Sequence, residues 1–465
     1  MNVTPGHVRG DARHGVETGS KAGDTAARAR TTSGARGQAA RQAALLTSAL
    51  AVTVCLASLT VLWTSGGTKD LNRAVFFAPF DLVLIAMIGW TLLHRQAVAD
   101  LFRARAVSLV SLAYVALFGV SLAAHPSWLG ASMGFHLMGG VAAIACVSTA
   151  CSATATRKAV LATIAGAGVF EALLAIAQAR HGGPLGIAYL DFGGPLYQFG
   201  TSYAGRGGFT HPYHLDLMLV LAEGAAVLGY RTACAVGERN RWGWVAATFV
   251  IGCGMGVTYS RTAVIGQSVL VLAALVGRDR RILVPFAAAV VAGLVLTGAT
   301  MGSGWVDRTS TTKSGANFDS GRRERMSESL ILMRSSPLVG VGPGRYVDAL
   351  AETDHYSKLP SHDLLLQEGA ELGVLGYVVS AAFLGLLVLR AWRGGAWTVA
   401  VVAPVLPFLL LDSYAYAGGG GLALSAVWLA LCRASLLPAD LEVEAGEADE
   451  ADDVTALATA PGGGL

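Results

Sequence analysis

Apolar runs of about 20 residues alternate with polar connections along most of the chain. They occupy residues 43–63, 74–93, 106–124, 128–147, 159–177, 213–230, 243–258, 262–276, 282–297, 372–389, 397–411 and 422–436. A helix that crosses a bilayer needs ~20 consecutive apolar residues, and several of the later runs are on the short side. The pattern predicts an all-α, polytopic integral membrane protein with about 12 transmembrane helices.

Composition agrees with this class and separates three regions. Hydrophobic residues make up 53% of the chain and charged residues 14%, whereas soluble domains carry about 25% charged residues. A net charge of +3 gives no argument for nucleic-acid binding. Residues 1–41 are basic and lack the apolar core of a signal peptide, so we expect a disordered cytoplasmic arm. Residues 438–465 are acidic and predicted to be a disordered tail, which leaves residues 42–437 as the membrane domain.

The distribution of basic residues predicts the orientation. With the N-terminal arm inside, the short outside loops contain only Lys69, Arg73 and Arg261. The short inside loops contain Arg95, Arg103, Arg105, Arg157, Lys158, Arg231, Arg239, Arg241, Arg278, Arg280, Arg281, Arg390 and Arg393. This is the positive-inside asymmetry of bacterial membrane proteins. Both termini are therefore expected in the cytoplasm, with two long exterior loops at about residues 178–212 and 299–371.

The second long loop ends in a histidine at the start of an apolar helix pattern, in LPSHDLLLQEGAELGVLGY. Ser361 is a favourable N-cap residue, which would place His362 in the first helical turn. The positive end of a helix disfavours an imidazolium, so the ring would stay neutral and able to accept a proton. The alternative is a surface histidine with no chemical role.

Several arginines are predicted at the same exterior face. Arg261 lies in YSRTAVIG between two apolar runs, and Arg206 lies in YAGRGGFTHPYHLDLML. Arg325 belongs to a short helix expected to end before Pro337, and Arg345 follows the glycines of GVGPGRY. A guanidinium binds phosphate oxygens in a bidentate manner and keeps its charge. Snorkelling to lipid headgroups and ordinary loop positions are the alternatives.

Two other patterns are better explained by a structural role than by a binding or catalytic one. The glycines of residues 340–344 are interrupted by proline and lack a strand–helix unit, so they predict a tight turn and not a dinucleotide site. Asp81, His136, Glu171, Asp216 and Glu223 lie within or beside apolar runs, where hydrogen bonds between helices are expected and a proton relay is the alternative. No exterior Asp-x-Asp pair and no Cys/His spacing predicts a metal, and no cofactor is expected.

The stretches MRSSPLVGVGPGRYVDAL and SHDLLLQEGAELGVLGY, preceded by SR at a span end, resemble the O-antigen ligase and Wzy polymerase superfamily. RGGFTHPYHLDLML resembles an earlier segment of that family, with His211 and His214 near positions where asparagine is usual. Asp363 stands where the family usually has asparagine after its histidine. These motifs lie between residues 206 and 377, and the first spans match only in hydropathy.

The resemblance implies a metal-independent, inverting glycosyltransferase of the GT-C type. Such enzymes act at the outer face of the bacterial cytoplasmic membrane on glycans linked to polyprenyl diphosphates such as undecaprenyl diphosphate, in the synthesis of cell-envelope polysaccharide. The family histidine maps onto His362 and the SR arginine onto Arg261, as catalytic residues. Substrate binding is expected of Arg206, Arg325, Arg345, His211 and Asp363. The expected partners are the lipid-linked donor, a glycan or lipid-glycan acceptor, and membrane lipid.

Two other functions fit the hydropathy. About 12 spans with buried acids also suit a transporter or a flippase for lipid-linked glycans. The long, late exterior loop and the absence of a visible repeat between the two halves argue against a transporter or flippase. A peptidoglycan polymerase of the shape-and-division type is a further alternative, whose motifs fit less well.

Overall fold

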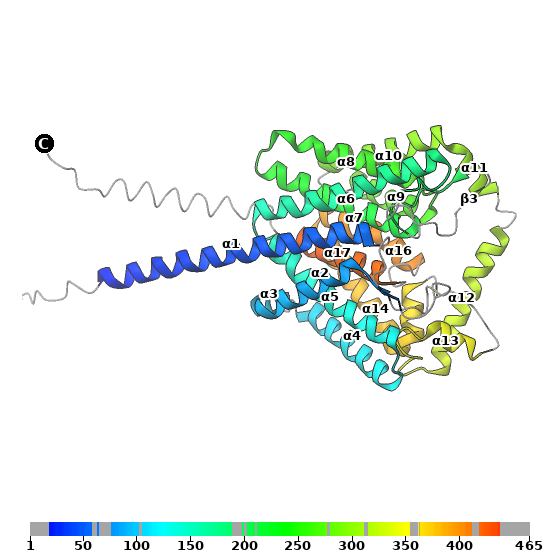
Figure 1. Ribbon diagram of the computed structural model, residues 1–465, viewed down its shortest axis with the longest axis horizontal. Coiled ribbons are helices and arrows are strands. Elements are labelled where there is room, and N and C mark those ends of the chain that lie inside the picture. Colours follow the sequence, from blue (N-terminus) through cyan, green and yellow to red (C-terminus); the bar gives the residue numbers. More distant parts are fainter. Residues whose placement is uncertain are drawn as a thin grey trace, which may run out of the picture.

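The protein is almost entirely helical (Figure 1). The computed structural model describes residues 18–57, 63–64, 76–101, 105–187, 198–199, 202–209, 212–276, 280–310, 315–353, 361, 363–411 and 418–437. The first half contains α1 (Thr18–Ala57), β1 (Trp63–Thr64), β2 (Phe76–Phe77), α2 (Pro79–Leu93), α3 (Arg95–Leu101), α4 (Arg105–Ala124), α5 (Trp128–Ala150), α6 (Thr154–His181), β3 (Gln198–Phe199), β4 (Ser202–Tyr203) and α7 (Pro212–Ala235). The second half contains η1 (Arg239–Arg241), α8 (Trp242–Gly256), α9 (Arg261–Val276), α10 (Arg280–Thr300), α11 (Gly302–Ser310), α12 (Gly315–Ser335), α13 (Tyr346–Ala351), α14 (Leu364–Gly394), α15 (Ala396–Val402), η3 (Ala403–Val405), α16 (Leu406–Leu411) and α17 (Gly418–Ser435).

The apolar runs correspond to helices, which confirms an all-α membrane protein. Within the described residues, five helices are long and apolar enough to cross a bilayer: Trp128–Ala150, Thr154–His181, His214–Ala235, Leu283–Thr300 and Leu364–Gly394. The remaining apolar helices are shorter, and the run at 397–411 is divided into α15, η3 and α16. The total of about 12 spans therefore stays a prediction.

The structure tests the disorder predicted for the N-terminal arm but not that predicted for the C-terminal tail. Helix α1 begins at Thr18, so helical backbone extends into the range that was predicted as a disordered arm. The acidic tail at 438–465 lies outside the described residues. The second long loop is largely helical and contains α11, α12 and α13. These helices lie at one end of the bundle, and the N-terminal part of α1 projects from the other end (Figure 1).

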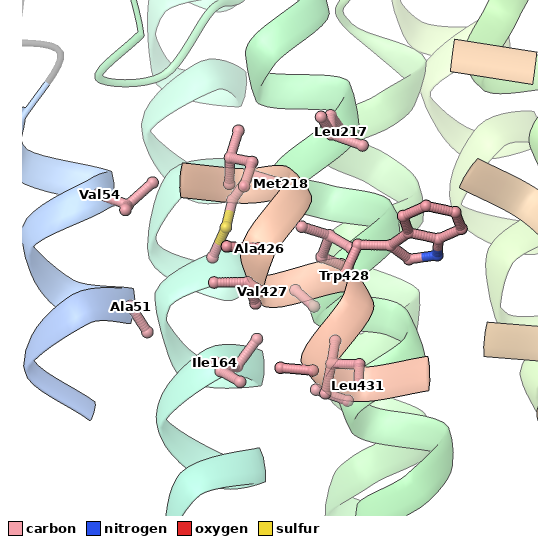
Figure 2. Packing of buried hydrophobic residues seen from close by; sticks show 14 of the residues in the cluster. Ala51, Val54, Ile164, Leu217, Met218, Ala426, Val427, Trp428 and Leu431 are labelled. Atoms are coloured by element: carbon pink, nitrogen blue, oxygen red, sulfur yellow. The ribbon is translucent and has the colours of Figure 1, made fainter. Parts of the chain in front are cut away.

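Helix α17 packs in the interior of the bundle (Figure 2). Its Val427, Trp428 and Leu431 are buried among side chains from α1, α6 and α7. The last described helix thus joins the start of the chain to its middle. It also contacts α5.

Small residues allow the helices of the middle segment to approach closely. A side chain at Gly252 of α8 would lie 2.9 Å from the backbone oxygen of Val290, and one at Gly293 of α10 would lie 2.7 Å from the backbone nitrogen of Cys253. Close backbone contact of this kind is a main source of stability between helices in a membrane, where lipid competes with every apolar side chain.

A buried polar pair joins α2 to α5. Nε2 of His136 lies 2.8 Å from Oδ1 of Asp81, and Nδ1 lies 2.7 Å from the backbone oxygen of Ser132. The other carboxylate oxygen of Asp81 accepts from the backbone N–H of Ala78 at 2.6 Å. Both side chains are buried, so each polar atom has a partner where no water competes. The expected helix–helix hydrogen bond is therefore present here.

Replacing His136 by alanine leaves one oxygen of Asp81 without its donor in this buried contact. A buried polar group that loses its partner costs about 1–3 kcal/mol. We expect His136→Ala to unfold at a lower temperature than the wild type in thermal melts of the detergent-solubilised protein, followed by circular dichroism. His181→Ala, at an exposed position at the end of α6, is the control. Equal melting temperatures for His136→Ala and wild type would show that the pair adds nothing to stability.

Candidate active site

The segment that carries Arg206 is buried against α6. The backbone N–H of Arg206 donates to Oε1 of Gln178 at 3.1 Å, and Nε2 of Gln178 donates to the backbone oxygen of Gly207 at 2.8 Å. One carboxylate oxygen of Glu171 accepts from the N–H of Gly208 at 2.6 Å. Glu171 and Gln178 are seven residues apart and therefore share one helix face. This face replaces water as the partner of a loop backbone inside the bundle.

Glycine at position 207 is required by two separate constraints. Its φ of 60° lies in the left-handed region, which side chains disfavour. A Cβ atom would also lie 2.2 Å from Oε2 of Glu171, the carboxylate that holds the next residue. The RGG sequence therefore places the side chain of Arg206, which is 2% exposed, directly before a turn without room for a methyl group.

Arg261 follows a strained turn between α8 and α9. Tyr259 has a φ of 52°, which is unfavourable for an aromatic residue, and its side chain is buried. Its hydroxyl donates to the backbone oxygen of Met301 at 3.5 Å, and its ring meets that of Trp305 edge-on at 5.8 Å. Oγ of Ser260 accepts from the N–H of Ala263 at 3.2 Å and so caps α9. Arg261 is consequently the first residue of α9, with an exposed side chain.

A backbone hydrogen bond joins the two arginine-bearing segments. The N–H of Gly205 donates to the oxygen of Val257 at 2.9 Å, next to the turn that precedes Arg261. A side chain at Gly205 would lie 2.4 Å from the backbone oxygen of Ala175 in α6, so this contact also needs a glycine. Segments whose bonded residues stand 52 positions apart in the sequence are thereby fixed side by side.

An open cleft of about 460 Å³ lies beside these segments. Its lining residues come from α6, β4, the turn before α9, and the α10–α11 junction: Ala179, Arg180, Gly182, Ser202, Tyr203, Tyr259, Thr300, Met301 and Ser303. Arg180 was not among the site residues expected from the sequence. Its position in the last turn of α6 was the available signal, because a helix C-terminus favours a basic side chain.

The histidine motif lies at the start of α14, and its helix begins later than expected. Asp363, not Ser361, is the N-cap residue, because its Oδ1 accepts from the N–H of Leu366 at 2.9 Å. Ser361 is buried, and its hydroxyl accepts from the N–H of Asp363 at 3.3 Å. The prediction that the histidine occupies the first helical turn is therefore wrong, since α14 starts at Leu364. His362 itself lies outside the described residues.

Residues 340–344 form a tight turn, as predicted, and this turn holds the first turns of α14. The N–H groups of Val341 and Gly342 donate to the backbone oxygens of Ala370 and Glu371 at 2.9 and 3.1 Å. The N–H of Gly344 donates to the side chain of Glu371 at 3.0 Å. Gly340, Gly342 and Gly344 all have positive φ, so the turn cannot be built from other residues without strain. The glycine-rich turn thus fixes the start of α14 through hydrogen bonds to Ala370 and Glu371.

Beyond these turns α14 breaks at Gly373, whose φ is 79°. The N–H of Val374 donates to the backbone oxygen of Pro337 at 2.8 Å across the break. The first part of α14 carries buried Gln367, Glu368 and Glu371, whereas the remainder is apolar. The expected span at 372–389 therefore begins at a conformational break and not at the helix start.

Arg325 and Arg345 lie on the elements that cover this part of α14. Helix α12 ends at Ser335, before Pro337 as expected. The hydroxyl of Tyr346 lies 2.8 Å from that of Ser329 and donates to the backbone oxygen of Arg325 at 3.3 Å. Burial raises the pKa of Tyr346, which keeps this donor protonated. The contact ties α12 to α13.

The side chain of Arg345, the N-cap residue of α13, is directed to the C-cap residue Glu352. Its Nη2 lies 3.6 Å from Oε1 of Glu352, in a pair that is exposed to solvent. The structure therefore places Arg325 on α12, Arg345 at the start of α13 and Asp363 at the start of α14. Arg206 and Arg261 belong to the segments whose Tyr203 and Tyr259 line the cleft, and neither arginine is itself a lining residue. His211 lies outside the described residues. Among the described residues, no group of three or more His, Cys, Asp or Glu side chains could hold a metal ion.

Comparison with known proteins finds a similarity in the middle of the chain. The family model described as O-antigen ligase matches residues 246–381, from α8 to the first half of α14. The predicted resemblance is confirmed over this segment, which contains Arg261, Arg325, Arg345, His362 and Asp363. Arg206 and His211 lie before it. No curated protein matches the chain.

Alanine at position 207 is expected to unfold the Arg206 segment. A left-handed φ costs about 1–2 kcal/mol for a residue with a Cβ atom, and the contact with Glu171 adds to this cost. Gly182→Ala is a matched control, because Gly182 has a φ of 77° with nothing within 4 Å of a Cβ atom. Thermal melts in detergent should show a clearly larger loss for Gly207→Ala than for Gly182→Ala. Equal losses would mean that the Glu171 contact imposes no constraint.

Asparagine at position 363 should keep the cap and remove the charge. Burial raises the pKa of Asp363 above that of an unfolded chain. The folded state therefore binds the proton more tightly, and stability falls as pH rises from the unfolded pKa through the folded one. Asp363→Asn lacks this titration, so its thermal stability relative to wild type should increase over that interval.

Asp363→Ala is the matched comparison, since loss of an N-cap costs about 1 kcal/mol. It should be less stable than Asp363→Asn at pH 7. An Asp363→Asn protein whose stability relative to wild type does not change between pH 4 and 7 would contradict the assignment.

Proposed function

We propose that this chain, a helical membrane protein with an O-antigen ligase domain at residues 246–381, is a glycosyltransferase of the ligase or polymerase type. It would move a glycan from a polyprenyl diphosphate to a sugar hydroxyl at the outer face of the bacterial cytoplasmic membrane, with both termini in the cytoplasm. The observation that carries the proposal is the hydrogen bond from Gly205 to Val257, which fixes the Arg206 and Arg261 segments together beside an open cleft.

The leaving group explains the need for these arginines. When the bond from the anomeric carbon to the diphosphate breaks, negative charge grows on the phosphate oxygens. Guanidinium groups held in place beforehand stabilise that charge without reorganising. The backbone of Arg206 is held by Gln178, and Arg261 follows a capped and strained turn, so both segments are fixed before substrate binds.

His362 is the proposed general base. The acceptor hydroxyl attacks the anomeric carbon from the side opposite the diphosphate, its proton passes to the imidazole, and the polyprenyl diphosphate leaves with the bonding electrons. Attack from the opposite side inverts the anomeric configuration. The histidine position lies between buried Ser361 and the cap residue Asp363, so the chain is anchored on both sides of it. Such a base contributes about 100- to 10,000-fold in rate.

The remaining candidates would act around this centre. Arg325 and Arg345 are proposed to attract anionic substrate to the elements over α14, and His211 to contact substrate near Arg206. No metal and no cofactor takes part in the proposed step. The reaction would belong to cell-envelope polysaccharide synthesis, with a glycan or a lipid-linked glycan as the acceptor.

The proposal predicts which lipid-linked glycans accumulate in cells. A strain lacking the gene, complemented with wild type, should clear an accumulated polyprenyl-diphosphate glycan when extracts are measured by mass spectrometry. His362→Ala and Arg261→Ala, inserted at equal level, should leave it uncleared because the base or the phosphate contact is lost. Arg239→Ala, at an exposed position in η1 away from the cleft, should clear it like wild type.

Each outcome separates one part of the proposal. Full clearance by His362→Ala would rule out the general base. If loss of the gene changes no lipid-linked glycan, the transferase is excluded and a transporter or flippase becomes the better account.

A further inference from the structure

We propose that the cleft beside Tyr203 and Tyr259 binds the sugar that follows the diphosphate in the donor, and that Arg180 determines its selectivity. This inference rests on the proposed function. It adds a saccharide subsite to the arginine-bearing segments.

The position of the cleft carries the inference. Two of its lining residues belong to the same segments as the proposed phosphate ligands: Tyr203 lies three residues before Arg206, and Tyr259 lies two residues before Arg261. A ligand whose diphosphate lies at these two segments would therefore have its next chemical group at the cleft. In a polyprenyl-diphosphate glycan, one neighbour of the diphosphate is the lipid and the other is a sugar.

The chemistry of the lining favours the sugar over the lipid. Arg180 and the hydroxyl-bearing residues Ser202, Thr300 and Ser303 contribute polar groups. Oγ of Ser202 lies 3.0 Å from Oγ of Ser303, which joins β4 to α11 across the rim. A hydrocarbon chain offers these groups no hydrogen bond, whereas sugar hydroxyls both donate and accept hydrogen bonds. A volume of about 460 Å³ is also within the range of small-ligand sites.

The wall of the cleft is preformed. The strained backbone of Tyr259 is held by its hydroxyl on Met301 and by the ring of Trp305. The indole N–H of Trp305 in turn donates to the backbone oxygen of Gly256 at 3.1 Å, at the end of α8. A rigid wall discriminates between ligands of different shape because it does not adapt to them.

The backbone of Arg180 is fixed at the end of α6, and its side chain is exposed. Helix α6 ends at Gly182 in a left-handed cap, whose N–H donates to the oxygen of Gln178 at 3.0 Å. The same Gln178 holds the backbone of Arg206 through its side chain. Arg180 thus projects into the cleft from a helix end that is locked to the phosphate-binding segment. Its five N–H donors suit the vicinal hydroxyls or the carboxylate of a sugar.

Equilibrium binding to the full-length protein in nanodiscs tests the subsite. The probes are the polyprenyl-diphosphate glycan extracted from the deletion strain and bare polyprenyl diphosphate. Arg180→Ala should weaken binding of the glycan-bearing lipid at least tenfold, because a charge-assisted hydrogen bond contributes about 1.5–3 kcal/mol. Binding of the bare lipid should change less than twofold. Arg261→Ala should weaken both probes, and Arg239→Ala should weaken neither.

A second variant reduces the volume of the cleft and leaves the charge of Arg180 in place. Ser303→Leu places a larger side chain at the lining and breaks the link to Ser202, so it should also weaken only the glycan-bearing probe. Equal weakening of both probes by Arg180→Ala would make it a phosphate ligand and overturn the subsite. Unchanged binding of the glycan-bearing lipid by both variants would overturn it as well.

Failure of the proposed function remains distinguishable. If wild type prefers the glycan-bearing lipid and Arg180→Ala abolishes the preference, the subsite stands even when wild type transfers no sugar. If wild type binds both lipids equally while transferring glycan, the transferase stands and the subsite falls.

Discussion

The candidate site depends on satisfying irregular backbone inside an apolar bundle. A loop at this depth has no water to pair with, and each unpaired polar group would cost several kcal/mol. Glu171 and Gln178 supply the missing partners from one face of α6, so residues 206–208 can leave helical geometry and still be buried. The same requirement explains why buried polar residues occur in an otherwise apolar helix. They support a loop and need no chemical role of their own.

Glycine has the complementary task at each point where backbone meets backbone. Gly205 and Gly207 let the Arg206 segment lie on α6, and the glycines of 340–344 let the turn lie on α14. At both places polar side chains form the hydrogen bonds. The glycines, which lack Cβ atoms, let the loop backbone lie close to the helix. These two groups of candidate residues are therefore built on one physical scheme, although they share no sequence motif.

The sequence predicted the apolar helices, the end of α12 before Pro337 and the tight turn at 340–344, because each depends on neighbouring residues only. The choice between Ser361 and Asp363 as cap could not be made this way, since both residue types cap well and they stand two positions apart. The role of Glu171 was equally hidden, because its partner Gly208 is 37 residues away. Arg180 was missed because it belongs to no motif and gains its place only when β4 and α11 meet beside α6.

The break at Gly373 has a mechanical consequence. The turn at 337–344 grips α14 on both sides of this residue, while the apolar remainder of the helix faces its neighbours and lipid. A transmembrane helix adjusts its tilt to the thickness of the bilayer. Here such tilting pivots at a fixed point, and the short polar helix above it stays registered to protein. We expect the geometry at Asp363, the cap of that short helix, to be set by the fold and therefore to be the same in membranes of different thickness.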